Sequence, residues 1–167
     1  MTVFYENDPS LQSYWRSIVL YGKNSASYKF ALAKSLMDLK GQPNDLIKLE
    51  DLAASFSKHL CEHLKHNDKQ STNPSSSFLD TCRKFNSNET SMDELIQTTK
   101  KLGFNDVIDA FHIVNGGEIP KRFFIDERIE NDGIRITENF FELNELQESE
   151  NLPREVEARW RLVETAW

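Results

Sequence analysis

The stretch that most constrains the fold is residues 14–39, which predicts two helices separated at Gly22. In the second helix apolar side chains occupy most of the circumference, and the polar residues Ser27, Lys34 and Asp38 form only a narrow strip. A helix that is apolar on nearly every side is stable only when other elements cover it. We therefore expect this helix to be the centre of the structure.

Apolar residues at helical spacing predict further helices in both directions along the chain. We expect helices over about 8–21, 50–66, 78–85, 91–102 and 105–115, then from Thr137 and from Leu152 to Trp167. Gly116-Gly117 is read as a helix stop. The Ser- and Asn-rich segment 67–77 is typical of a flexible loop.

The hydrophobic period changes from helical to alternating after residue 117. Residues 122–129 and 134–137 flank Asn131-Asp132-Gly133, which predicts a β-hairpin because Asp-Gly tolerates positive φ. The predicted fold class is mainly α, helical bundle-like, with one β-hairpin in the C-terminal third. Its predicted parts are a helical domain at 1–117, the hairpin at 118–137 and C-terminal helices at 138–167.

Length and composition indicate a soluble globular protein. The chain has 167 residues, of which 38% are hydrophobic, and a net charge of -7. No apolar run reaches membrane-spanning length, and the N-terminus lacks the pattern of a signal peptide. The two cysteines, Cys61 and Cys82, lie inside helical patterns, which is typical of a reducing compartment. We therefore expect a cytoplasmic location without membrane contact.

The charges are unevenly distributed along the chain. Residues 10–40 hold one acid, Asp38, whereas acidic residues outnumber basic ones over 118–167. A net-positive stretch of this kind is able to contact the phosphate backbone of DNA. The candidate nucleic-acid-binding residues are Arg16, Lys23, Asn24, Lys29 and Lys34. The alternative is a solvated face that contacts no partner.

One short motif has a specific chemical meaning. His59-Leu60-Cys61-Glu62-His63 matches H-x-x-E-H, which on a helix directs two imidazoles toward one zinc ion and a glutamate toward a water. His63, however, falls inside the apolar stripe of its helix, which favours a partly buried histidine bonded to a backbone carbonyl. We assign no metal ligand and no catalytic residue, since the chain also lacks a G-x-S-x-G elbow and a P-loop.

Three stretches together resemble a known family. They are Tyr14-Trp15-Arg16 with residues 27–34, residues 107–112 with 115–120 and 122–124, and residues 152–167. They are similar to the N-terminal region of prokaryotic HNH endonucleases of the restriction or phage-defence kind. The resemblance implies that a nuclease module with a metal-bound His-Asn-His site follows this region. A divalent metal is then expected only in that module, with no cofactor in this chain.

The last predicted helix ends on Trp167, an apolar residue on its apolar face, without a glycine or asparagine cap. This ending indicates a longer protein that continues past Trp167. We expect the non-catalytic recognition or regulatory region of an HNH-type DNA endonuclease, which positions DNA, forms a homodimer or binds a partner subunit. The alternative is a protein-interaction module without nucleic-acid contact, and the third hypothesis is a zinc hydrolase built on His59 and His63.

Overall fold

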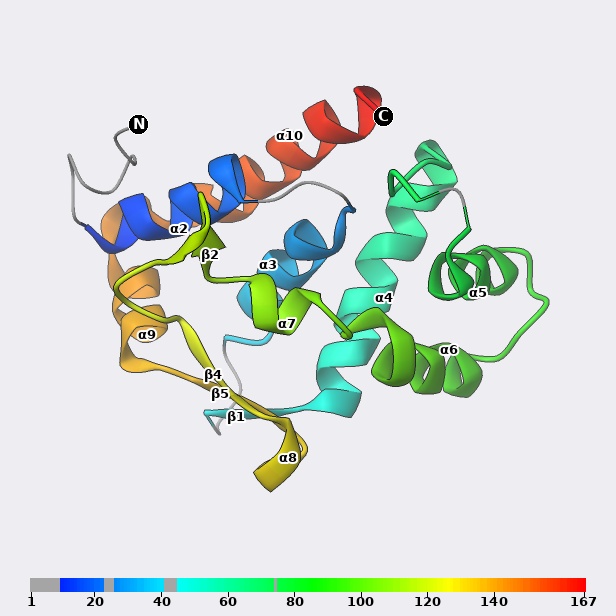
Figure 1. The fold of residues 1–167 in the computed structure, drawn as a ribbon, viewed down its shortest axis with the longest axis horizontal. Helices are drawn as coiled ribbons and strands as arrows, with labels where there is room; N and C mark the ends of the chain where they lie inside the picture. The colour runs from blue at the N-terminus through cyan, green and yellow to red at the C-terminus, as the bar shows by residue number, and fades with distance from the viewer. Residues whose placement is uncertain (1–9, 23–25, 41–44, 74) are drawn as a thin grey trace.

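The structure is a computed structural model that describes residues 10–22, 26–40, 45–73 and 75–167 (Figure 1). The first half contains α2 (Leu11–Tyr21), α3 (Tyr28–Asp38), β1 (Leu46–Lys48), α4 (Leu49–His66) and α5 (Ser77–Asn86). Next come α6 (Met92–Thr98), the π-helical turn η1 (Thr99–Gly103), α7 (Val107–Ala110), β2 (Ile113–Val114) and β3 (Gly117–Glu118). The last part contains β4 (Phe124–Glu127), α8 (Arg128–Asn131), β5 (Gly133–Ile136), α9 (Glu138–Glu145), the 3₁₀ turn η2 (Gln147–Asn151) and α10 (Leu152–Thr165). The fold is mainly α, as predicted.

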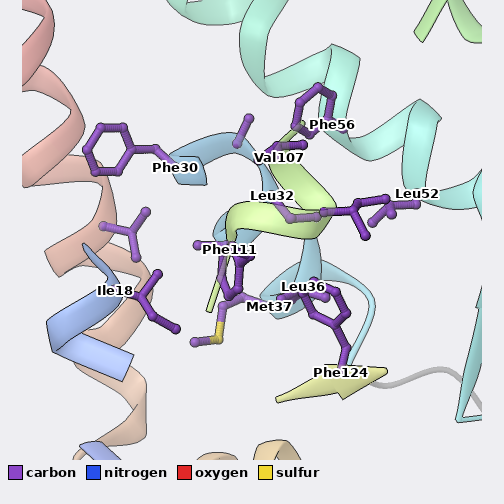
Figure 2. Close-up of a cluster of buried hydrophobic side chains, with 14 of the residues drawn as sticks. Ile18, Phe30, Leu32, Leu36, Met37, Leu52, Phe56, Val107, Phe111 and Phe124 are labelled. Atoms are coloured by element: carbon purple, nitrogen blue, oxygen red, sulfur yellow. The ribbon is translucent and has the colours of Figure 1, made fainter. Parts of the chain in front are cut away.

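Helix α3 occupies the centre of the fold, and it packs against α4, α7 and α10 (Figure 1). Its side chains Phe30, Leu32 and Leu36 are fully buried. Figure 2 shows them among apolar side chains from α2, α4, α7 and β4. The predicted polar strip is narrower still, because Ser27 is also fully buried. The sequence pattern thus correctly identified the central helix.

The prediction of a single hairpin is wrong, because the strands form two small sheets. β4 and β5 pair antiparallel as predicted, and Asp132 between them has a positive φ of 52°. The other edge of β5 pairs with β1, which gives the strand order β1-β5-β4. The sequence did not predict β1, because a three-residue strand is too short to show an alternating pattern.

The second sheet lies where the sequence predicted a helix and its stop. Helix α7 ends at Ala110, and Ile113–Val114 pairs antiparallel with Gly117–Glu118. Asn115 and Gly116, the turn residues, have φ values of 52° and 81°. Two consecutive positive φ values are typical of a tight hairpin turn. Asn-Gly therefore reverses the chain here.

In the part of the chain that the structure describes, serine hydroxyls cap three helices at their N-termini. Ser10 accepts a hydrogen bond from the Ser13 amide at 3.2 Å, and Ser91 accepts one from the Glu94 amide at 3.1 Å. Ser76 does the same for α5. Each bond satisfies one of the free amides of a first helical turn. The start predicted at residue 8 lies outside the described residues.

Among the described residues, one cluster of buried apolar side chains runs from Tyr14 to Val163. It draws residues from the predicted helical part, the hairpin part and the C-terminal helices, so all three share this core. Within the described ranges, no helix is both long and apolar enough to cross a bilayer.

The burial of Leu32 makes the central position of α3 testable. Leu32→Ala is expected to lower the free energy of unfolding by about 2–5 kcal/mol, because it removes buried methyl groups and leaves a cavity. Urea denaturation measures this loss. Leu162→Ala, at a leucine that is 62% exposed, is the control and should change stability by less than about 0.5 kcal/mol. Equal effects of the two substitutions would contradict the central position of α3.

Candidate functional site

Two of the predicted DNA-binding cations form ion pairs with α10. Arg16 forms a bidentate pair with Glu155. Its Nε donates to Oε1 at 3.0 Å, and its Nη2 donates to Oε2 at 3.2 Å. Lys34 Nζ lies 2.5 Å from Glu157 Oε1. Both acids belong to the acidic C-terminal part of the chain, so the predicted basic stretch meets the acidic segment within one molecule.

Lys29, the third predicted cation, points into the protein. Its Nζ donates to the carbonyl of Gly22 at 2.8 Å and to that of Ile18 at 3.1 Å. Arg159 of α10 donates to the neighbouring Leu20 carbonyl at 3.3 Å. Burial, with a smaller contribution from Arg159, lowers the pKa of Lys29 to about 7. These side chains donate to carbonyls at the C-terminus of α2, where a helix favours positive charge.

The remaining predicted DNA-binding residues, Lys23 and Asn24, lie outside the described residues. The structure thus brings Arg16, Lys29 and Lys34 to one side of the molecule, near α10. Each of the three is engaged with groups of this chain.

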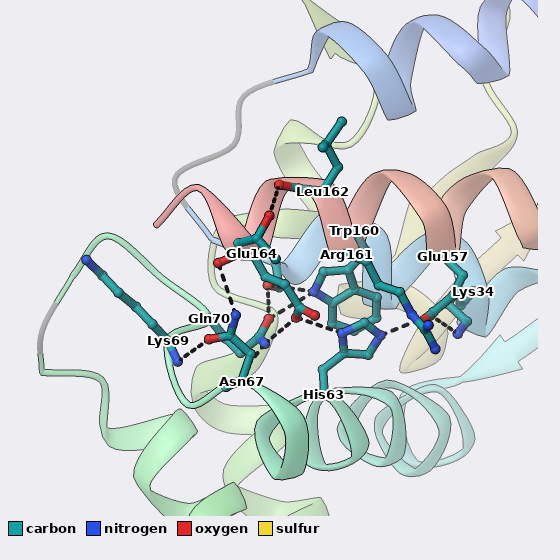
Figure 3. Close-up of polar contacts among 12 residues, drawn as sticks. Lys34, His63, Asn67, Lys69, Gln70, Glu157, Trp160, Arg161, Leu162 and Glu164 are labelled. Atoms are coloured by element: carbon teal, nitrogen blue, oxygen red, sulfur yellow. Dashed lines mark hydrogen bonds and ion pairs between the residues drawn. The ribbon is translucent and has the colours of Figure 1, made fainter.

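The most elaborate polar arrangement in the described residues surrounds Trp160 of α10 (Figure 3). His63 of α4 stacks on the Trp160 indole with ring centroids 3.4 Å apart and planes 1° from parallel. His63 Nδ1 lies 2.8 Å from Glu164 Oε2, and Nε2 lies 2.9 Å from Glu157 Oε1. Since carboxylates only accept hydrogen bonds, the histidine donates to both when its ring carries both protons. The prediction that His63 bonds to a backbone carbonyl is wrong, because both of its ring nitrogens contact glutamates of α10.

Gln70 completes this arrangement from the segment that the sequence predicted to be a flexible loop. Its side chain is fully buried, and Nε2 donates to Glu164 Oε2 at 2.6 Å. Trp160 Nε1 donates to Gln70 Oε1 and to Ser27 Oγ, each at 2.9 Å. The Ser27 amide also donates to the Gln70 carbonyl at 3.0 Å. We call the five residues His63, Gln70, Glu157, Trp160 and Glu164 the α10 clasp.

The H-x-x-E-H motif does not converge on one point. His59 Nε2 lies 2.5 Å from Asp38 Oδ2, and Glu62 pairs with Lys65 at 3.0 Å. His63, by contrast, faces the acids of α10. Over the ranges that the structure describes, no group of three or more His, Cys, Asp or Glu side chains is placed to hold a metal ion.

His112 is the remaining histidine of chemical interest, and it belongs to an aromatic cluster. It is 1% exposed, and its Nε2 accepts a hydrogen bond from the Phe123 amide at 2.9 Å. Burial, followed by the nearby Arg122, lowers the pKa of His112 to about 3. A neutral ring enclosed by Phe111, Phe123 and Phe124 orients the backbone at Phe123 and is closed to a substrate.

Comparisons with known proteins do not identify a relative. No protein-family model matches the chain, and no curated protein or solved structure matches it.

From the contacts of Glu157 in the α10 clasp we expect the protein to lose stability at acidic pH. Burial acts to raise the pKa of Glu157, but hydrogen bonds from Lys34, His63 and Arg161 lower it to about 2, below the ordinary value of 4.5. Its contribution to stability is therefore complete above pH 4.5 and is lost as the pH falls toward 2. Glu157→Gln should reduce the slope of unfolding free energy against pH in this interval, as measured by urea denaturation at several pH values. Wild-type and variant curves that run parallel would contradict the role of Glu157.

Proposed function

We propose that this chain is the non-catalytic recognition or regulatory region of an HNH-type DNA endonuclease, and that it acts through protein contacts. We favour protein contact over DNA contact because Arg16, Lys29 and Lys34 already bind carboxylates or carbonyls of this chain. A cation already paired with a carboxylate or carbonyl gains less from a phosphate, because the existing contact must first be broken. The family assignment itself rests on the sequence resemblance.

The proposal places catalysis in another part of the protein. The nuclease module with its divalent metal follows this region, and this chain positions it or its partner. The buried and free Cys61 and Cys82 agree with a cytoplasmic location.

The outer face of the β1-β5-β4 sheet is the surface that we propose for protein contact. Leu46, Arg135 and Ile125 lie opposite one another across the three strands and so share one face. Ile125 is 43% exposed, and Ile129 in α8 is 97% exposed at the projecting end of the hairpin (Figure 1). These two exposed isoleucines are the apolar residues that we propose for the contact.

The charges around this face favour a second copy of the chain as the partner. Arg135 pairs with Glu127 at 2.6 Å and with Asp45 at 2.8 Å, and Lys48 lies at the end of β1. Two acids and two bases make the face locally neutral on a protein whose net charge is -7. A locally neutral face lets two copies related by a twofold axis approach each other without strong charge repulsion at the contact.

The dimer is tested by the oligomeric state of the full chain. Light scattering after size-exclusion chromatography should give a mass that rises with concentration from one copy to two. Ile129→Glu should remove this rise, because it places a charge in the apolar contact. Ile113→Glu, at a residue 45% exposed on the other sheet, is the matched control and should leave the dimer intact. A wild-type monomer at all concentrations would exclude the second copy as partner.

DNA binding is the competing function, and salt dependence distinguishes it. We expect no cleavage with Mg²⁺, Mn²⁺ or Zn²⁺, and only weak binding to a generic duplex, which Arg16→Ala/Lys34→Ala leaves unchanged. If the predicted residues contact phosphates, each lost contact should reduce the slope of log K against log salt by about 0.9. Fluorescence anisotropy at several salt concentrations measures this slope, with Lys23→Ala as a further variant and the exposed Lys121→Ala as control. A lower slope in the Arg16/Lys34 variant but not in the control would replace protein contact with DNA contact.

A further inference from the structure

The only two cysteines of the chain, which lie 21 residues apart in sequence, meet in the fold. Cys61 is in α4 and Cys82 is in α5, two helices that pack against each other (Figure 1). Cys61 Sγ donates a hydrogen bond to the Cys82 carbonyl oxygen at 3.8 Å, which brings the Cys61 thiol next to the residue that carries the second thiol. Neither is part of a disulfide.

A hydrogen bond joins α4 to α5 at Cys61 itself. Asn86 at the end of α5 donates from Nδ2 to the Cys61 carbonyl at 2.9 Å. Cys82 is fully buried, and so are Leu60 and Leu79, the apolar neighbours in the two helices. The packing of α4 against α5 therefore holds Cys61 and Cys82 next to each other.

A route for a small reagent leads to one of the two thiols. Cys61 lines a surface groove of about 710 Å³ between α4 and the segments 85–86 and 92–95. Lys58 and Lys65 of α4 line the same groove. Cys82 does not line it, so the groove offers Cys61 as the first point of attack.

We propose that Cys61 and Cys82 are a site of reversible oxidative modification, at which a hydroperoxide closes a disulfide that links α4 to α5. In the first step, written for hydrogen peroxide, the Cys61 sulfur attacks one peroxide oxygen and the O–O bond breaks. The sulfur keeps that oxygen as a sulfenic acid, and the other oxygen leaves with the Cys61 proton as water. In the second step the Cys82 sulfur attacks the Cys61 sulfur, the S–S bond forms, and the hydroxyl leaves with the Cys82 proton as a second water. The two thiols lose two electrons in total, and the peroxide gains them.

The environments of the two thiols fit these separate roles. Contact with Cys82 lowers the pKa of Cys61 more than burial raises it, and Lys65 lowers it further. Contact with Cys61 and burial raise the pKa of Cys82. Because Cys61 lines the groove and Cys82 does not, Cys61 is the nucleophile toward the peroxide and Cys82 the thiol that resolves the sulfenic acid.

The test is peroxide oxidation of the full chain, followed by alkylation with N-ethylmaleimide under denaturing conditions and intact mass measurement. The wild type should lose about 2 Da, one hydrogen from each thiol, take up no maleimide, and recover both thiols in dithiothreitol. A peptide map without reductant should show the Cys61 peptide joined to the Cys82 peptide. Cys82→Ser should show no loss of about 2 Da within one chain, and its Cys61 should stop at the sulfenic acid, which dimedone traps.

A comparison with the unfolded chain separates pairing by the fold from chance pairing. The same peroxide is added in urea, and the disulfide should form more slowly there, because the thiols are no longer held together. Two maleimide adducts on the oxidised native protein would overturn the proposal. A rate in the native protein equal to or below the rate in urea would overturn it as well.

Discussion

The structure depends on the burial of Trp160 against residues that are far away in the sequence. Its ring stacks on His63 of α4 and on Phe30 of α3, and its Nε1 reaches Gln70 in the following loop. One side chain of α10 thereby fixes three earlier segments, and it is fully buried in doing so. A large aromatic ring contributes apolar burial, and its single N–H requires a partner inside, which Ser27 and Gln70 supply. This explains why polar residues are present in an otherwise apolar region.

The position of α10 also explains the uneven distribution of charge along the chain. The basic residues of α2 and α3 and the acidic residues of α10 are more than 120 positions apart, yet they form the pairs Arg16–Glu155 and Lys34–Glu157. A stretch that is net positive in sequence is therefore compensated in space. Sequence reasoning assigned those cations to an external polyanion, because it has no means of identifying a partner so distant in the chain. The carboxylates of α10 compete with DNA phosphates for these cations, because a phosphate must displace a carboxylate that the fold already holds nearby.

The features that the sequence predicted correctly are those that depend on local order. Helical spacing located α3, α4 and α10, and Asp132-Gly133 located the β4–β5 pair. The features that it missed depend on partners elsewhere in the chain. β1 exists because β5 offers it an edge, and Gln70 is ordered by Trp160 and Glu164, although its neighbours have a loop-like composition. Asn115-Gly116 was a recognisable hairpin signal, and the adjacent helical pattern concealed it.

Helix α4 connects the parts of this molecule because each of its sides serves a different neighbour. Leu52 and Phe56 face the core around α3 (Figure 2), and His63 holds α10 (Figure 3). His59 lines the groove on another side, and Cys61 meets α5. A covalent link at Cys61 would thus join α5 to the helix that already anchors α10. Cys61 and His63 lie two positions apart in α4, so this link would form beside the residue that holds α10.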